Sequence, residues 1–201
     1  MQKEFGSFGD NAVATMQAKG NIAPETVGIE GHYHVVCRDK DGNIKWEDKF
    51  PNLVMAVGKQ LMLNTLLVTA SGYTRVGPFL GLLKSGYTPA AADTMSITTA
   101  NEFVNYTVGG SAVRGTAAFS SSTSSGTTPS NVTTCAATSI TYTITGAGGT
   151  VAGCFLATGT GAVNTQLSTA GTLYSAGNFT TAKTTTSGDT VSVTYSTTAT
   201  S

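Results

Sequence analysis

The chain has 201 residues, enough for one domain, with or without an extension, that buries a real core without disulfides or metal ions. Eleven basic residues balance eleven acidic ones and only 11% of the chain is charged, so little field remains to hold a polyanion, and nucleic-acid binding is disfavoured. A hydrophobic share of 40% argues against a disordered tail.

The N-terminal segment, residues 1–29, is predicted to be an extended arm. Glycines interrupt it, and Phe5 and Phe8 are isolated aromatics, so the segment cannot build a core of its own. It lacks an apolar signal core, and nowhere does the chain reach the roughly 18 apolar residues that span a bilayer. We therefore expect synthesis in a cytosol and no membrane partner. The arm is either a frayed terminus or a segment that orders against a neighbouring subunit.

A hairpin and a helix are predicted next. Residues 30–38 and 43–50 have strand-like sequences, and the intervening Asp-Gly pair is a strong hairpin turn signal. Asn52 is expected to cap a helix over residues 53–68. Apolar side chains recur there near helical spacing at Val54, Val57 and Leu61.

The middle of the chain predicts short strands separated by loops. Residues 77–83 form a short apolar run bounded by turn signals, which is typical of a buried strand. Residues 87–95 contain a proline and are predicted to be a loop. Weaker strand patterns follow over residues 103–108 and 112–119, and a Ser- and Thr-rich loop over residues 120–130 ends this part.

The C-terminal half is almost uncharged. Residues 103–201 hold 27 threonines and 14 serines, but only three charged residues, Arg114, Lys183 and Asp189. Threonine is β-branched and favours strands, so this half is predicted to be β-rich, with hydroxyl groups rather than charges keeping its surface soluble.

Alternation of apolar and polar residues defines the strands of this half. Residues 139–145 alternate strictly, with one face formed by Ile140, Tyr142 and Ile144. Residues 151–157 are expected to return after a turn, with one face formed by Val151, Gly153, Phe155 and Ala157. Residues 173–174 and 191–195 mark two further strands. Residues 30–201 are therefore predicted to form a mainly β, jelly-roll-like antiparallel β-sandwich with one helix.

Chemical motifs are sparse. His32 and His34 have a known metal spacing and would share one face of a strand, but Cys37 would point to the other face, so no metal site is predicted. The sequence from Asp39 to Asn43 resembles part of a calcium loop, yet its glycine position does not fit, and a hairpin turn is expected instead. With both histidines in one strand and no nucleophile motif, we predict no catalytic residue, no cofactor and no enzymatic activity.

Three cysteines complete the list of reactive side chains, at Cys37, Cys135 and Cys154. An odd number without a CxxC pair fits neither a disulfide framework nor a zinc ribbon. We interpret the three as buried, reduced thiols that act as small apolar side chains.

The order of these segments resembles a group of small virion proteins encoded in the structural-gene region of tailed bacteriophages. The resemblance covers roughly residues 30–200 and is carried by five segments: PNLVMAVGKQLMLNTLL, FLGLLKSGYTPAAADTM, GGTVAGCFLAT, GTLYSAGNF and GDTVSVTYS. Some members of the group look like capsid cement or decoration proteins with a jelly-roll-like sandwich. The resemblance thus implies a non-enzymatic protein on the capsid surface of the virion, assembled in the host cytoplasm, which binds and stabilises the major capsid shell.

Partners follow from that resemblance. A cement protein would bind the major capsid protein and itself, as a homodimer or homotrimer, and the arm would dock on another subunit through Phe5 and Phe8. A tail, neck or fibre component of the same virion is an alternative. A carbohydrate-binding host-adhesion β-sandwich is another, and it would need exposed aromatic side chains, for which the candidates are Trp46, Tyr33, Tyr73 and Tyr87.

Overall fold

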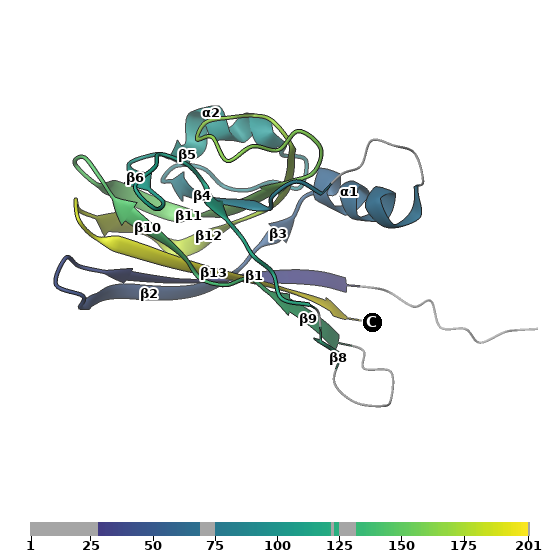
Figure 1. Ribbon diagram of the computed structural model, residues 1–201, viewed down its shortest axis with the longest axis horizontal. Coiled ribbons are helices and arrows are strands. Elements are labelled where there is room, and N and C mark those ends of the chain that lie inside the picture. Colours follow the sequence, from purple (N-terminus) through teal and green to yellow (C-terminus); the bar gives the residue numbers. More distant parts are fainter. Residues whose placement is uncertain (1–27, 69–74, 122, 125–131, 201) are drawn as a thin grey trace, which may run out of the picture.

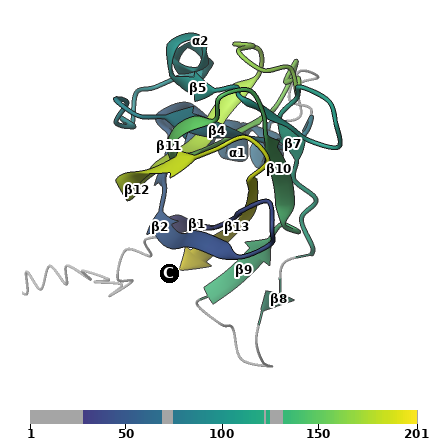
Figure 2. The same ribbon diagram turned by 90° about the vertical axis from the view of Figure 1, so that its left-hand side faces the viewer.

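The structure is a computed structural model that describes residues 28–68, 75–121, 123–124 and 132–200. Two antiparallel sheets face each other as a β-sandwich (Figures 1 and 2). The mainly β antiparallel fold predicted from the sequence is thereby confirmed. Phe5, Phe8 and Tyr73 lie outside the described residues.

Seven strands of the described residues form the first sheet. Their spatial order is β2 (Ile44–Pro51), β1 (Gly28–Arg38), β13 (Thr190–Thr200), β10 (Ile140–Ile144) and β6 (Tyr106–Thr107), with β9 (Val132–Ala136) and β8 (Thr123–Ser124) continuing beside β13. The hairpin of β1 and β2 matches the prediction, although β1 already begins at Gly28. The central strand β13 pairs with β1 over its whole length, from Gly28 opposite Thr200 to Arg38 opposite Thr190.

The second sheet has six strands in the described part of the chain. Their order is β3 (Leu53–Val54), β12 (Thr172–Thr185), β11 (Gly149–Thr158), β4 (Phe79–Lys84) and β5 (Glu102–Phe103), with β7 (Gly115–Thr116) also paired to β4. The predicted buried strand over residues 77–83 is thus β4, while the weaker patterns over residues 103–108 and 112–119 give only two-residue strands. Helix α1 (Ala56–Leu67), the 3-10 turn η1 (Met95–Ile97) and the short α2 (Thr98–Asn101) complete the elements.

Four buried tyrosines from the first sheet occupy the space between the sheets. Their hydroxyl groups contact polar atoms across the core: Tyr33 with Ser175 Oγ at 3.1 Å, Tyr142 with the carbonyl of Leu80 at 2.7 Å, Tyr106 with Glu102 Oε1 at 3.5 Å, and Tyr195 with the side-chain amide of Asn52 at 3.0 Å. A buried phenol needs such a partner because an unpaired polar group costs free energy in an apolar core. The tyrosines therefore fix both the spacing and the register of the two sheets.

The helix begins later than the sequence predicts, and Asn52 does not cap it. Leu53 and Val54 form the edge strand β3 on β12, so helix α1 starts at Ala56, after an N-cap residue, Met55, that makes no side-chain capping bond. The side chain of Asn52 instead donates to Tyr195. The prediction was wrong here because pairing with β12 and a buried tyrosine partner, both tertiary contacts, compete with capping for these residues.

The predicted shared face of residues 151–157 is also wrong for Val151. A bulge between Val151 and Gly153 shifts the alternation, so Val151 lies in the core between the sheets while Phe155 lies on the opposite face. Strand β11 is buried on both faces, because η1, α2 and the loop before β12 cover the outer face of the second sheet (Figure 1). That cover creates a second apolar cluster of Met55, Leu83, Met95, Phe155, Ala157, Leu173 and Ala176.

The tyrosine layer predicts that stability is lost at alkaline pH. Burial raises the pKa of Tyr33 and Tyr142 well above the ordinary value of 10.0, and it raises the pKa of Tyr195 to about 12. Because the folded state holds these phenols protonated, their contribution is intact below pH 10 and disappears as the pH rises through the folded values. For Tyr195 alone the loss amounts to roughly 2–3 kcal/mol above pH 12.

Denaturant titrations at a series of pH values, together with tyrosinate absorbance, test this expectation. The free energy of unfolding is expected to fall steeply between pH 10 and pH 12, and most tyrosinate should form only as the protein unfolds. Tyr142→Phe keeps the ring but removes one shifted phenol, so it should flatten the pH dependence. Complete tyrosine ionisation in the folded protein near pH 10 would contradict the assignment.

Candidate interaction surface at one end of the sandwich

Helix α1 lies at the end of the sandwich where the C-terminus also lies, opposite the β1–β2 turn (Figure 1). Gly58 is its buried residue, and a side chain there would collide with the backbone carbonyl of Tyr174 in β12. Glycine thus allows the helix backbone to lie directly on the strand. Val57 packs against the second apolar cluster from the same side of the helix.

Three leucines on α1 are left in solvent. Leu63, Leu66 and Leu67 are 59%, 77% and 74% exposed, and their spacing of three and four residues places them side by side on the helix. The helix carries a single charged residue, Lys59. An exposed, nearly uncharged row of leucines is typical of an interaction surface rather than of a solvated helix face.

An apolar cavity of about 320 Å³ adjoins this row of leucines. Eight of its lining side chains are apolar or aromatic: Leu61, Met62, Leu66, Pro78, Phe119, Leu156, Tyr174 and Tyr195. Leu156 is buried in the core between the sheets, whereas Leu66 is exposed, so the cavity runs from the surface into the sandwich. Among the described residues that line the cavity, the one charged side chain is that of Arg75, which is also exposed. We call the exposed leucines and this cavity together the α1-end surface.

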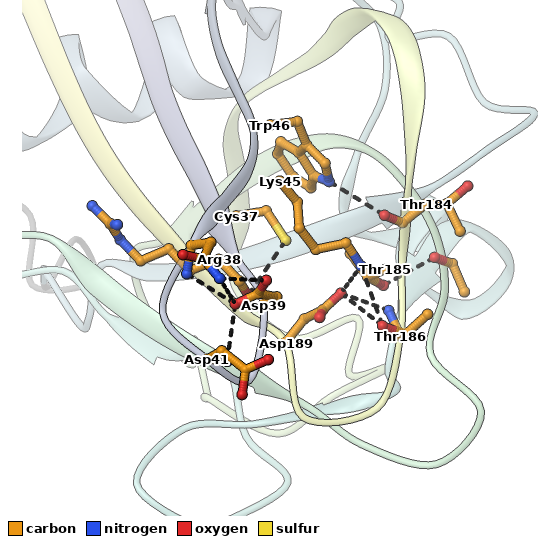
Figure 3. Close-up of polar contacts among 12 residues, drawn as sticks. Cys37, Arg38, Asp39, Asp41, Lys45, Trp46, Thr184, Thr185, Thr186 and Asp189 are labelled. Atoms are coloured by element: carbon orange, nitrogen blue, oxygen red, sulfur yellow. Dashed lines mark hydrogen bonds and ion pairs between the residues drawn. The ribbon is translucent and has the colours of Figure 1, made fainter.

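At the opposite end of the sandwich, polar side chains form hydrogen bonds with other groups of the same chain (Figure 3). The carboxylate of Asp189 accepts bonds from the Lys45 ammonium at 2.5 Å and from the backbone N–H of Thr186 at 2.7 Å. Burial acts to raise the pKa of Asp189, but the Lys45 and Thr186 donors outweigh it and hold that pKa below its ordinary value. The indole N–H of Trp46 donates to the carbonyl of Thr184 at 3.2 Å. These bonds join the β1–β2 hairpin to the turn between β12 and β13.

The calcium-like sequence Asp39–Asn43 is a hairpin turn, as predicted. Asp39 Oδ1 accepts the backbone N–H groups of Asp41 and Asn43 at 2.9 and 2.8 Å. The Asn43 side-chain amide, followed by its backbone amide, lowers the pKa of the Asp39 carboxyl. The turn itself therefore occupies the carboxylate oxygens.

The two histidines lie on the outer face of β1, as expected. Their neighbours Tyr33 and Cys37 point into the core, and His34 Nε2 lies 2.7 Å from the Glu47 carboxylate on β2. Among the described residues, no group of three His, Cys, Asp or Glu side chains is placed to hold a metal ion.

Two of the three cysteines are buried free thiols, which confirms their predicted state. Burial raises the pKa of Cys37 to about 11 and raises the pKa of Cys154 further. Both are therefore protonated thiols at neutral pH, not nucleophilic thiolates. The side chain of Cys135 lies outside the described ones.

The most strongly buried charges form an ion pair between Arg114 and Glu102. Arg114 donates to the two carboxylate oxygens of Glu102 at 2.9 and 2.7 Å, and neither side chain is exposed. Arg114 also binds the carbonyl of Ser168 at 2.8 Å, Glu102 accepts the N–H of Leu167 at 2.7 Å, and the guanidinium lies 5.1 Å from the Phe155 ring centre. The bonds to Ser168 and Leu167 hold the loop before β12 on the second sheet, so the pair has a structural role.

The aromatic side chains proposed for carbohydrate binding are used elsewhere. Tyr33 is fully buried between the sheets. Trp46 is half-buried against Phe179 with an edge-on ring contact, and Tyr87 donates to the Asp93 carboxylate at 2.6 Å. None of these three rings forms an open stacking platform.

Sequence reasoning missed the α1-end surface. The residue pattern contained a signal, because Leu63, Leu66 and Leu67 form a second apolar row beside the predicted buried row of Val57 and Leu61. When a helix with apolar residues on two sides lies on the edge of a sandwich, only one side is buried and the other stays exposed to solvent.

The longest helix among the described residues, α1, has 12 residues and is too short to cross a bilayer. Comparison of the chain with protein-family models, curated proteins and solved structures returns no match.

Gly58→Ala is expected to destabilise the fold by roughly 1–3 kcal/mol, because the new methyl group overlaps Tyr174 and displaces α1. In an unobstructed helix the same change would stabilise by about 0.5–1 kcal/mol. Thr65→Ala, at an exposed site on the same helix, is the control and should be neutral or slightly stabilising. Denaturant melts of both variants decide the matter, and equal stabilisation by both would show that the helix does not touch β12 closely.

Glu102→Gln is expected to cost roughly 3–5 kcal/mol in the free energy of unfolding, because Arg114 then remains buried without a counter-charge. The exposed pair of Lys40 and Asp41 supplies the control, and Asp41→Asn should leave stability unchanged within error. Chemical denaturation measures both changes. Similar small losses for the two variants would mean that the Arg114 pair is not desolvated.

Proposed function

We propose that this chain is a non-enzymatic structural protein of a tailed-bacteriophage virion, a capsid cement or decoration protein that binds and stabilises the major capsid shell. The phage assignment comes from the segment pattern of residues 30–200. The observation that carries a binding role is the α1-end surface, where three exposed leucines adjoin an apolar cavity of about 320 Å³. Exposure of such an apolar surface to water is unfavourable, and burying it against a partner lowers the free energy.

The distribution of charge supports this role. The chain has zero net charge, and all three charged residues after Glu102 are bound to partners from the N-terminal half: Arg114 to Glu102, Lys183 to Asp48 and Asp189 to Lys45. Threonine and serine, 27 and 14 residues, supply most of the other polar side chains of residues 103–201. Many copies of such a protein can be placed next to one another on a shell without like-charge repulsion.

The rigidity of the sandwich supports it as well. Hydrogen bonds from Tyr33 and Tyr142 join the sheets, and the buried pair of Arg114 and Glu102 holds the covering loop. A cement protein adds durability through many modest contacts acting together, which requires that each copy keep its shape under load.

Purified virions provide the test. The protein is expected to co-purify with intact particles in a density gradient, and a tagged copy should be located on the capsid surface by electron microscopy. Particles that lack the protein should release their DNA at a lower temperature than complete particles, and adding the purified protein back should restore the difference.

The same images separate the alternatives. A tag confined to the neck, tail or fibres would overturn the cement role in favour of a tail component. Absence of the protein from washed particles would overturn the virion role altogether. Unchanged DNA release after its removal would show that the protein decorates the shell without stabilising it.

A further inference from the structure

The α1-end surface lies where the N-terminal segment leaves the sandwich. Strand β1 begins at Gly28, and its residue Gly31 is paired with Thr197, which lines the cavity. Three residues of strand correspond to roughly 10 Å, so the chain leaves the domain close to the mouth of the cavity. Phe8 lies 20 positions before Gly28, a stretch that reaches at most about 70 Å when extended. That length can reach the equivalent cavity of an adjacent copy.

The cavity suits an aromatic ring. An apolar cavity of roughly 150 Å³ accepts benzene in another protein, so a volume of about 320 Å³ leaves room for at least one phenyl group. Phe5 and Phe8 are the aromatic residues of the N-terminal segment, and both are flanked by small or polar residues rather than by apolar neighbours.

The charges of the cavity rim and of the N-terminal segment are complementary. Arg75 is exposed at the cavity and forms no ion pair with any described acidic side chain. Glu4 directly precedes Phe5, and Asp10 lies two residues after Phe8. A phenylalanine of this segment in the cavity would bring a carboxylate towards Arg75.

The area argues for a second copy rather than for the chain's own segment alone. Two phenylalanine rings bury roughly 300–500 Å² together. A stable interface needs about 800 Å² from each partner. The exposed Leu63, Leu66 and Leu67 supply the additional apolar area, and the chain's own segment in its own cavity would leave them in water. In a dimer with a two-fold axis, each copy covers the α1 helix and the cavity of the other through the same set of contacts.

We propose that the α1-end surface binds a second copy of this chain, with the α1 leucines of the two copies in contact and Phe5 or Phe8 of each copy in the cavity of the other. This inference deepens the proposed function, since it names the surface through which copies associate. The contact forms between purified copies and needs no capsid.

Sedimentation of the full-length protein at increasing concentration is the first experiment. We expect reversible self-association that is weakened by Leu66→Gln combined with Leu67→Gln, and separately by Phe5→Ala combined with Phe8→Ala. Each pair of changes should raise the dissociation constant roughly 10- to 100-fold. Glutamine is a good helix former, so the leucine variant should keep its fold, which a thermal melt verifies.

The matched control is Ile44→Gln. Ile44 is 53% exposed and is the first residue of β2, after the β1–β2 turn at the opposite end of the sandwich. Its replacement by glutamine should leave association unchanged. Thr65→Trp fills the cavity from its exposed rim without removing a core side chain, and it should weaken association as the phenylalanine changes do.

Photo-crosslinking identifies the occupant. A benzoylphenylalanine at position 8 in heavy-isotope protein, mixed with unlabelled protein, should form heavy–light crosslinks to peptides of α1. Crosslinks only within one chain, or a native mass spectrum with a small apolar molecule in the cavity, would overturn the proposal. So would a full-length protein that stays monomeric, or association that is insensitive to the leucine and phenylalanine changes.

These outcomes are independent of the virion experiment. Self-association through the α1-end surface, with the protein absent from particles, would reject the capsid role and keep this contact. Monomers that bind the capsid would reject this contact and keep the capsid role.

Discussion

Desolvated polar groups between the two sheets determine most of this architecture. A tyrosine ring brings a large apolar area into the core, but its hydroxyl group must find a partner there. The hydroxyl groups of Tyr33 and Tyr142 have their hydrogen-bond partners on the opposite sheet, so these bonds set the distance between the two sheets. A register slip of β1 or β10 by one residue would leave these hydroxyl groups without their partners and move the inward side chains of that strand to the outside. The sandwich thus has one well-defined register.

Long-range ion pairs have a similar effect on a chain with few charges. The three charged residues of the C-terminal half are all paired to residues before position 103, and the separations along the chain range from 12 residues for Arg114 and Glu102 to 144 for Lys45 and Asp189. The contacts differ in burial. Only the Arg114 pair is fully desolvated, so it alone is essential for the loop that covers the second sheet. Of the others, the pair of Lys45 and Asp189 joins β2 to the turn before β13, and the pair of Lys183 and Asp48 joins β12 to β2.

The two ends of the molecule are therefore chemically different. At the turn end, the carboxylates of Asp39 and Asp189 are occupied by local donors. At the other end, α1 rests on β12 through Gly58 and presents leucines to solvent beside an open cavity. The proposed attachment to a larger assembly would use the apolar end, because the polar groups at the turn end already have partners within the chain.

The sequence by itself determined the local elements. Alternation predicted β10 and the core of β13, the Asp-Gly pair predicted the first hairpin, and the apolar run at residues 77–83 predicted β4. These features depend on side-chain periodicity and turn chemistry within a few residues. Tertiary structure alone decided the role of Asn52, the bulge at Val151 and the burial of Arg114, since each depends on a partner distant in the chain. It also decided which leucines of α1 are exposed at the candidate interaction surface. Leucines at positions 63, 66 and 67 look like core residues in sequence, and only the docking of α1 on β12 through its other side leaves them exposed.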